Sequence, residues 1–126
     1  MSETSAPFFS PDWWDQVIAA WNASPHTDSL AGLGAITFKI LDEEAAACLE
    51  WDAAGQARRL EAPAEGAPGL GATREHWRQY IAGEFKAAVG VMTGKLKFEG
   101  NMAALLPFAE GVQQFVEISR EAAGVA

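Results

Sequence analysis

Few residues of this chain combine the types and the spacing that catalysis requires. The segment from Gly90 to Leu96 places two glycines ahead of Lys95, as a phosphate-binding loop does, but the glycines are one residue too close and no Ser or Thr follows the lysine. The only tyrosine, Tyr80, and the only cysteine, Cys48, have no activating neighbour in the sequence. The sequence therefore indicates no phosphate loop and no complete set of nucleophile, acid and base.

Metal-binding residues are equally sparse. His26 and His76 are fifty positions apart, with no matching ligand cluster near either. The single cysteine excludes both a CxxC-type metal site and an intramolecular disulfide. The carboxylates of Asp42, Glu43 and Glu44 follow a predicted strand, where a solvated turn is the simpler interpretation. We expect neither a metal nor any other cofactor.

The charge balance argues against nucleic acid as a partner. Nine basic and seventeen acidic residues give a net charge of −8, which opposes binding to phosphate backbones and to anionic membrane surfaces. A local basic patch would form if the pair Arg58 and Arg59 lay on a strand next to Lys95 and Lys97. Such a patch could receive phosphate groups, for example those of coenzyme A.

Length and composition predict one globular domain spanning residues 1–126, because 126 residues with 49% hydrophobic side chains can bury one substantial core. No basic, apolar leader opens the sequence, and no apolar run reaches the roughly 18 residues that a membrane span needs. A single cysteine is compatible with a reducing compartment. We therefore expect a cytoplasmic protein without integral membrane association.

Patterns of apolar residues predict the elements that position these groups. Ser10 and Pro11 can open a helix in which Trp14 and Trp21 share one face. Further along, the apolar period changes from helical to the two-residue rhythm of strands. The predicted strands lie at 34–41, 45–51, 56–62 and near 70–73. The predicted helices lie at 11–22, at 74–93 with a break at Gly83, and at 102–121 with a kink or division at Pro107, with a short helical turn within 27–33.

A short strand between two apolar helices is the most specific pattern in the chain. It includes the run from Lys95 to Gly100. Because successive side chains of a strand alternate between faces, Leu96 and Phe98 share one face while the charged residues around them share the other. Asn101 is suited to cap the helix that follows.

This strand and its surroundings resemble the sterol carrier protein family, in the form of its small bacterial members. The run MTGKLKFEGN from Met92 to Asn101 carries most of the resemblance. Apolar residues on both sides of the run contribute to it: Phe85, Ala88, Val89, Val91, Met102, Leu105 and Leu106. Weaker similarity upstream covers Trp21, Asn22, Pro25 and 34–41.

The resemblance implies an α+β fold, in which helices cover one face of a five-stranded, mostly antiparallel sheet and leave an apolar tunnel between the layers. It also implies non-catalytic binding and transfer of a lipid: a fatty acid, a fatty acyl-CoA or a sterol-like molecule. The last helix, with its wide apolar arc and its break at Pro107, would gate the tunnel. The predicted tunnel walls are apolar residues, namely Trp77, Ile81, Phe85, Val89, Met92, Leu96, Phe98, Met102, Leu105, Leu106, Phe108, Val112 and Phe115.

Two alternatives to lipid carriage stay open at this point. The apolar C-terminal helix could instead dock onto a second copy of the chain or onto a partner enzyme, because the same residues would suit an interface. The chain could also be an enzyme acting on a lipid-like substrate, with Tyr80 or His76 transferring a proton.

Overall fold

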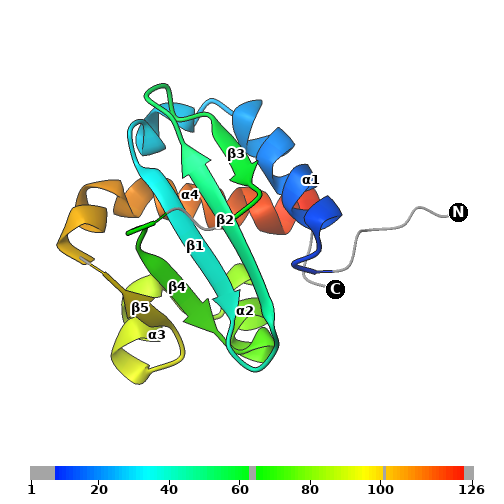
Figure 1. Cartoon of the computed structure of the whole chain (residues 1–126), viewed down its shortest axis with the longest axis vertical. Helices are drawn as coiled ribbons and strands as arrows, with labels where there is room; N and C mark the ends of the chain where they lie inside the picture. Colours follow the sequence, from blue (N-terminus) through cyan, green and yellow to red (C-terminus); the bar gives the residue numbers. More distant parts are fainter. Residues whose placement is uncertain (1–7, 63–64, 101, 124–126) are drawn as a thin grey trace, which may run out of the picture.

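A five-stranded sheet with helices packed on one face forms the framework of the protein (Figure 1). The computed structural model describes residues 8–62, 65–100 and 102–123. The strands are β1 Gly34–Ile40, β2 Ala45–Trp51, β3 Ala57–Leu60, β4 Gly69–Ala72 and β5 Lys97–Glu99. The α-helices are α1 Pro11–Asn22, α2 Arg74–Ile81, α3 Ala87–Thr93 and α4 Ala109–Ala123, and two 3₁₀ helices are η1 Thr27–Leu30 and η2 Met102–Phe108. The expected α+β class is confirmed.

The strands are arranged in the order β3-β2-β1-β4-β5. β1 and β2 are antiparallel, as are β2 and β3, and β4 and β5. Among the strand pairs of the described residues, β1 and β4 alone run parallel, with Thr37 opposite Gly69. The sheet is thus mostly antiparallel, as expected.

Local signals explain where the helices begin. The hydroxyl of Ser10 accepts a hydrogen bond from the backbone N–H of Trp13 at 3.2 Å, and Pro11 occupies the first turn of α1. Thr73 caps α2 in the same way, by accepting from the N–H of His76 at 3.2 Å. The predicted starts of these two helices, at residues 11 and 74, are confirmed.

Some boundaries differ from those predicted. β3 is shorter than the expected 56–62, and its first residue, Ala57, is bound to the end of α1: its N–H donates to Asn22 Oδ1 at 2.7 Å and its carbonyl accepts from Asn22 Nδ2 at 2.9 Å. The predicted helix over 102–121 is divided at Pro107 into a 3₁₀ segment and α4. Asn101, the expected cap, lies outside the described residues.

The core lies between the sheet and the helices. Ile36, Phe38 and Ile40 point inward from β1, because alternate side chains share a face. Trp13, Trp14, Val17 and Trp21 form the buried side of α1. On the opposite face of the sheet, Thr37 is also buried, and its N–H donates to the Pro68 carbonyl at 3.0 Å in the β3–β4 connection.

Candidate functional site: an aromatic cavity between sheet and helices

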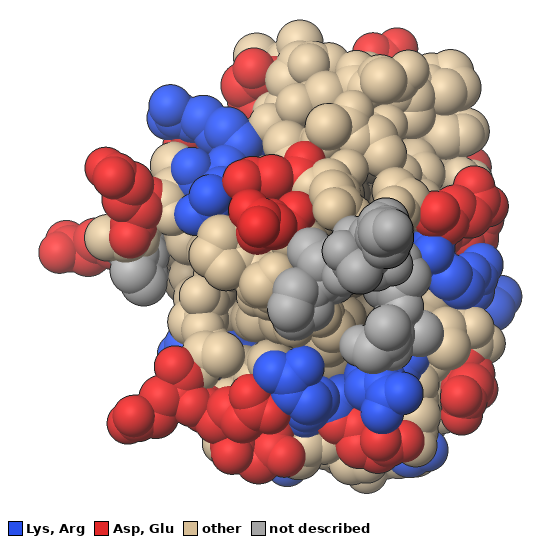
Figure 2. Space-filling view, turned by 90° about the vertical axis from the view of Figure 1, so that its right-hand side faces the viewer, with Lys and Arg blue, Asp and Glu red and all other residues tan. Residues whose placement is uncertain are grey.

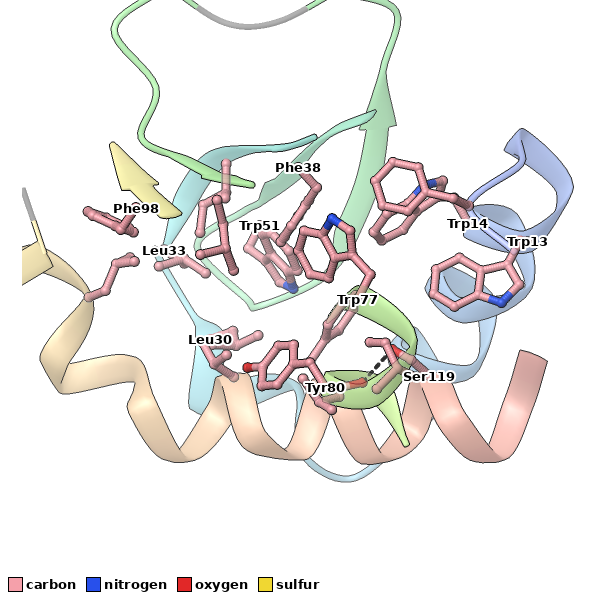
Figure 3. A pocket seen from close by; sticks show the side chains of 18 of the residues that line it. Trp13, Trp14, Leu30, Leu33, Phe38, Trp51, Trp77, Tyr80, Phe98 and Ser119 are labelled. Carbon is pink, nitrogen blue, oxygen red and sulfur yellow. Dashed lines mark hydrogen bonds between the residues drawn. The ribbon is translucent and has the colours of Figure 1, made fainter. Parts of the chain in front are cut away.

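An apolar cavity of about 70 Å³ lies between the inner face of the sheet and the helices (Figure 3). Residues from every strand except β3, and from α1, α2 and α4, contribute to its walls. None of the described residues that line it is charged. Its volume exceeds the roughly 10–15 Å³ that one water needs, but it is below the roughly 300–1,000 Å³ typical of small-molecule pockets.

Four aromatic rings from the N-terminal segment close one end of the cavity. Phe8, Phe9, Trp13 and Trp14 meet edge to face, with ring centroids 4.9–5.7 Å apart, and Trp14 stacks on Phe38 at 5.3 Å. Phe9 has a φ of 73°, a conformation that bulky residues seldom adopt. This turn of the backbone precedes α1 and lets both phenylalanine rings be buried. We call these four residues the aromatic end.

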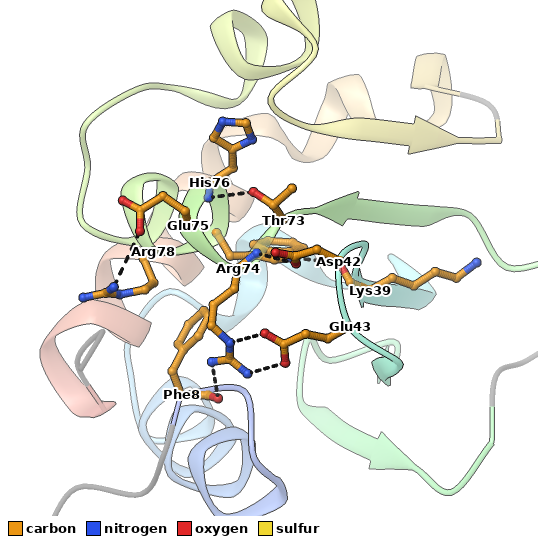
Figure 4. A network of polar contacts seen from close by, with 10 residues as sticks. Phe8, Lys39, Asp42, Glu43, Thr73, Arg74, Glu75, His76 and Arg78 are labelled. Carbon is orange, nitrogen blue, oxygen red and sulfur yellow. Dashed lines mark hydrogen bonds and ion pairs between the residues drawn. The ribbon is translucent and has the colours of Figure 1, made fainter.

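An ion pair fixes the aromatic end to the rest of the fold (Figure 4). The Arg74 guanidinium donates to both carboxylate oxygens of Glu43, one of them at 2.8 Å, and to the Phe8 carbonyl at 3.3 Å. These hydrogen bonds hold the pKa of the Glu43 carboxyl below its ordinary value. Asp42 accepts the backbone N–H of Arg74 at 3.0 Å. The turn that sequence analysis treated as simply solvated therefore connects β1, α2 and the N-terminal segment.

The opposite end of the cavity is made of aliphatic residues and one phenylalanine. Leu33 precedes β1, Leu70 lies on β4, Phe98 on β5, Leu105 in η2 and Val112 on α4. All five are only partly buried. We call these five residues the aliphatic end.

Three buried polar atoms that belong to wall residues have no hydrogen-bond partner among the described residues. They are the Tyr80 hydroxyl and the indole nitrogens of Trp14 and Trp51. Burial raises the pKa of Tyr80 to about 12. Ser119, also in the wall, donates to the Phe115 carbonyl at 2.7 Å.

The structure brings six of the thirteen predicted wall residues to this cavity. These are Trp77, Ile81, Phe98, Leu105, Val112 and Phe115. Phe85, Leu96 and Phe108 pack into or against the core without lining the cavity. Val89, Met92 and Leu106 are exposed, by 49%, 85% and 67% respectively. The side chain of Met102 lies outside the described part of the chain, and contact of any of the thirteen with a ligand stays a prediction.

Sequence analysis missed several aromatic residues of the wall. It placed the walls on the C-terminal elements, whereas Trp14, Phe38, Trp51 and Tyr80 are equally part of them. A signal was present, because the helical stripe that contains Trp14 and the alternation around Phe38 both predict inward-facing side chains. The sequence does not show whether these inward-facing side chains surround a space or a filled core. That depends on how distant segments pack together.

The condition for a basic patch is not met. Arg58 and Arg59 lie on β3 and Lys97 on β5, and these strands form opposite edges of the sheet. Arg58 pairs with Glu50 at 2.6 Å and Arg59 with Asp15 at 3.2 Å. On the face shown in Figure 2, basic side chains lie among acidic ones. Lys95 is elsewhere again, with its ammonium group 5.1 Å from the centre of the Phe85 ring.

Among the described residues, no group of His, Cys, Asp and Glu side chains could hold a metal ion. None of the helices that the described residues form has the length and apolar character needed to span a bilayer. Cys48 is buried and unpaired.

Solved structures with the same fold include sterol carrier proteins. No family model and no curated protein matches this chain by sequence. A crystal structure of sterol carrier protein 2 superimposes with a TM-score of 0.77 at 21% identity, over 92% of this chain and 99% of that one. A conserved hypothetical protein of Thermus thermophilus, described as a candidate sterol carrier protein, gives 0.75 at 20% identity, over 97% and 96%.

A third similar structure is part of an enzyme. The sec-alkyl sulfatase PisA1 matches with a TM-score of 0.62 at 17% identity, over 79% of this chain but only 16% of that chain. Similarity to the enzyme is thus confined to a small part of its length. Taken with the arrangement of strands and helices, the comparisons show that this chain has the sterol carrier protein 2 fold.

Proposed function

We propose that this chain binds a lipid in the cavity between sheet and helices and transfers it without catalysing a reaction. The observation that carries the proposal is that the described residues of the cavity wall carry no charge and, apart from Ser119, are apolar or aromatic. The solved structures with the same fold include sterol carrier protein 2. We further propose that residues 1–126 act as one domain in the cytoplasm. Within the described residues, α1 and α4 pack together on the inner side of the sheet.

The hydrophobic effect alone would give useful affinity. Each methylene that leaves water contributes about 0.8 kcal/mol, and micromolar affinity requires about 8.2 kcal/mol. About ten buried methylenes therefore suffice before ordering costs are counted. A site of this kind favours long acyl chains and discriminates weakly between them.

The cavity must widen to accept such a chain, because about 70 Å³ holds only a few atoms. The aliphatic end is the wall best suited to move. Leu105 and Val112 are only partly buried there, and Pro107 lies inside η2 near the point where this 3₁₀ helix gives way to α4. We propose that η2 and the first turn of α4 shift outward to admit the lipid.

The structure gives the alternatives less support. Phe115 and Val116 of α4 are buried in the core, so the helix uses its apolar side internally rather than for docking. Tyr80 would be a poor proton-transfer group, since burial keeps its hydroxyl protonated at neutral pH.

Native mass spectrometry of gently purified protein, followed by lipid extraction, tests the proposal. We expect a near-stoichiometric lipid on the wild type. A Val112→Glu variant, which places a carboxylate in the wall, should lose it, whereas Leu106→Glu at an exposed position should retain it. Thermal melts must show that both variants fold. Wild-type protein that is free of lipid and does not bind a fluorescent fatty acid would refute the carrier function.

A further inference from the structure

We propose that the bound lipid carries an uncharged carbonyl, as a fatty acyl ester or a long-chain ketone does, and that the Tyr80 hydroxyl and the Trp51 indole N–H bind this carbonyl inside the cavity. The inference rests on the proposed function and narrows its ligand class. It follows from the polar atoms in the wall, which the carrier function does not use.

Both groups are buried donors without an acceptor. Tyr80 is 3% exposed and Trp51 is 2% exposed, both line the cavity, and neither polar atom has a partner in the described structure. A buried donor that has lost its water and gained no acceptor costs free energy. Other indoles in this chain avoid that cost, because Trp77 donates to the Lys39 carbonyl at 2.7 Å and Trp21 to the Gly55 carbonyl at 2.8 Å.

The two donors come from opposite layers. Trp51 ends β2 and meets Phe115 of α4 edge to face at 5.2 Å. Tyr80 lies on α2, with its ring stacked on Phe85 at 5.7 Å. In Figure 3 the Tyr80 hydroxyl points to the side of the cavity where Leu30 lies, and Trp51 lies across the cavity on the sheet. Their rings are held by packing. The wall presents almost no polar surface to the cavity, so both donors can meet a ligand only when the cavity widens as proposed above.

Trp14, which carries the third unpartnered nitrogen, is left out of this pair. It lies at the aromatic end and borders a second cavity of about 170 Å³, whose walls include Arg59 and Glu61. Trp14 therefore also borders a space with charged residues in its wall, whereas Tyr80 and Trp51 do not.

The absence of charge in the described wall selects the kind of acceptor. An ionised carboxylate placed there would leave water without meeting any cation, which is far more costly than burying a neutral carbonyl. Tyr80 itself stays protonated and able to donate, since burial raises its pKa to about 12. A neutral carbonyl satisfies two unpartnered donors and carries no charge penalty.

Three matched ligands test the inference: methyl palmitate, heptadecane and palmitate, the last at about pH 8, where a carboxylate is ionised. Each displaces a fluorescent lipid from wild-type protein and from Tyr80→Phe, which removes one oxygen. Thr37→Val is the control, because it removes a buried hydroxyl that lies outside the cavity wall and already has an acceptor in Cys48 Sγ. We expect Tyr80→Phe to weaken methyl palmitate roughly three- to tenfold and to leave heptadecane unchanged, with Thr37→Val affecting neither.

The outcomes separate this inference from the proposed function. If the ester and the alkane bind equally well, or if Tyr80→Phe weakens both alike, the protein is a carrier but the carbonyl site is wrong. If ionised palmitate binds as tightly as the ester and with the same dependence on Tyr80, the selection for a neutral group is wrong. If no ligand binds the wild type, the carrier function itself fails.

Discussion

The two ends of the cavity are built in different ways. At the aromatic end, Phe8, Phe9, Trp13 and Trp14 are buried and touch one another in a chain of ring contacts. At the aliphatic end the wall residues are only partly buried. The nearby elements α3 and η2 expose Met92 and Leu106. One end therefore resembles a filled core, and the other resembles a surface that has not been covered.

This difference predicts that one end of the cavity stabilises the fold and that the other end admits the lipid. A ring cluster that is ordered by packing, and fixed by Arg74 to Glu43 and Phe8, resists opening because every contact must be lost together. A partly buried aliphatic wall loses few packing contacts when it moves. We therefore expect substitutions at the aromatic end to change the free energy of unfolding, and substitutions at the aliphatic end to change mainly how lipid enters.

The largest effect should follow from Trp14→Ala. Trp14 contacts Phe9, Trp13 and Phe38 with ring centroids 4.9–5.3 Å apart, and its removal leaves a void among rings that cannot all collapse. We expect a loss of about 3–5 kcal/mol in the free energy of unfolding, measured by denaturant titration.

The matched control for this substitution is Leu106→Ala at the exposed aliphatic side, which should change the same quantity by less than about 0.5 kcal/mol. Equal losses for the two variants would show that the two ends do not differ in packing.

Gly111→Ala tests how α4 is held near the aliphatic end. A Cβ at this position would lie 2.6 Å from the Ser29 carbonyl oxygen and from Leu30 Cδ2, so α4 would have to move away from η1. Overpacking costs about 1–3 kcal/mol, and alanine recovers up to about 1 kcal/mol over glycine within a helix. We expect a net loss of about 1 kcal/mol in unfolding free energy, together with faster lipid uptake in stopped-flow fluorescence.

Glu110→Ala, on the exposed neighbour in the same helix, is the control and should change neither quantity appreciably. A stabilised Gly111→Ala protein would show that the space around α4 already accommodates a methyl group.

A smaller, pH-dependent effect should come from Glu43→Gln. Because Arg74 lowers the pKa of Glu43 in the folded protein, the ion pair stabilises the fold above the ordinary glutamate pKa of about 4.3. That contribution is lost as the pH falls through the lowered pKa, since protonation then favours the unfolded chain. The melting temperature of wild type should exceed that of Glu43→Gln near neutral pH, and the difference should shrink in acid.

Glu44→Gln, in the same turn, serves as the control for general charge effects and should show no such convergence. A difference between wild type and Glu43→Gln that is constant down to strong acid would mean that the carboxylate charge is not what Arg74 recognises.

Sequence reasoning recovered what is encoded locally. Ser10, Pro11 and the spacing of Trp14 and Trp21 lie within one helix, and the predicted span 11–22 is the observed α1. The orientation of the Phe98 side chain, which faces the cavity, follows from strand alternation in the same way. Such features depend on neighbours a few residues away, which a sequence shows directly.

What sequence reasoning missed depends on distant segments. The parallel pairing of β1 with β4 puts β3 and β5 at opposite edges, which separates Arg58 from Lys97. The contact of Arg74 with the Phe8 carbonyl likewise joins segments 66 residues apart. Neither register nor strand order is specified by the residues of one strand alone.

The smallest effect on stability, and the sharpest test of access, is the double variant Met92→Ser and Leu106→Ser. Both side chains are exposed, so the free energy of unfolding should stay within about 0.5 kcal/mol per site of the wild-type value. Exposed apolar side chains beside a movable wall can contact a neutral bilayer, where burial is favourable and the chain's net charge of −8 brings no repulsion. We expect slower lipid uptake from phosphatidylcholine vesicles with unchanged equilibrium affinity.

Leu41→Ser is the control for this variant, because Leu41 is also exposed but belongs to the β1–β2 turn that is joined to the aromatic end through Glu43 and Arg74. If lipid enters at the aliphatic end, Leu41→Ser leaves uptake unchanged while the double variant slows it. Equal slowing by both would mean that any exposed apolar side chain promotes vesicle contact. The contrast between the ends would then concern packing alone, because access would not depend on which wall faces the membrane.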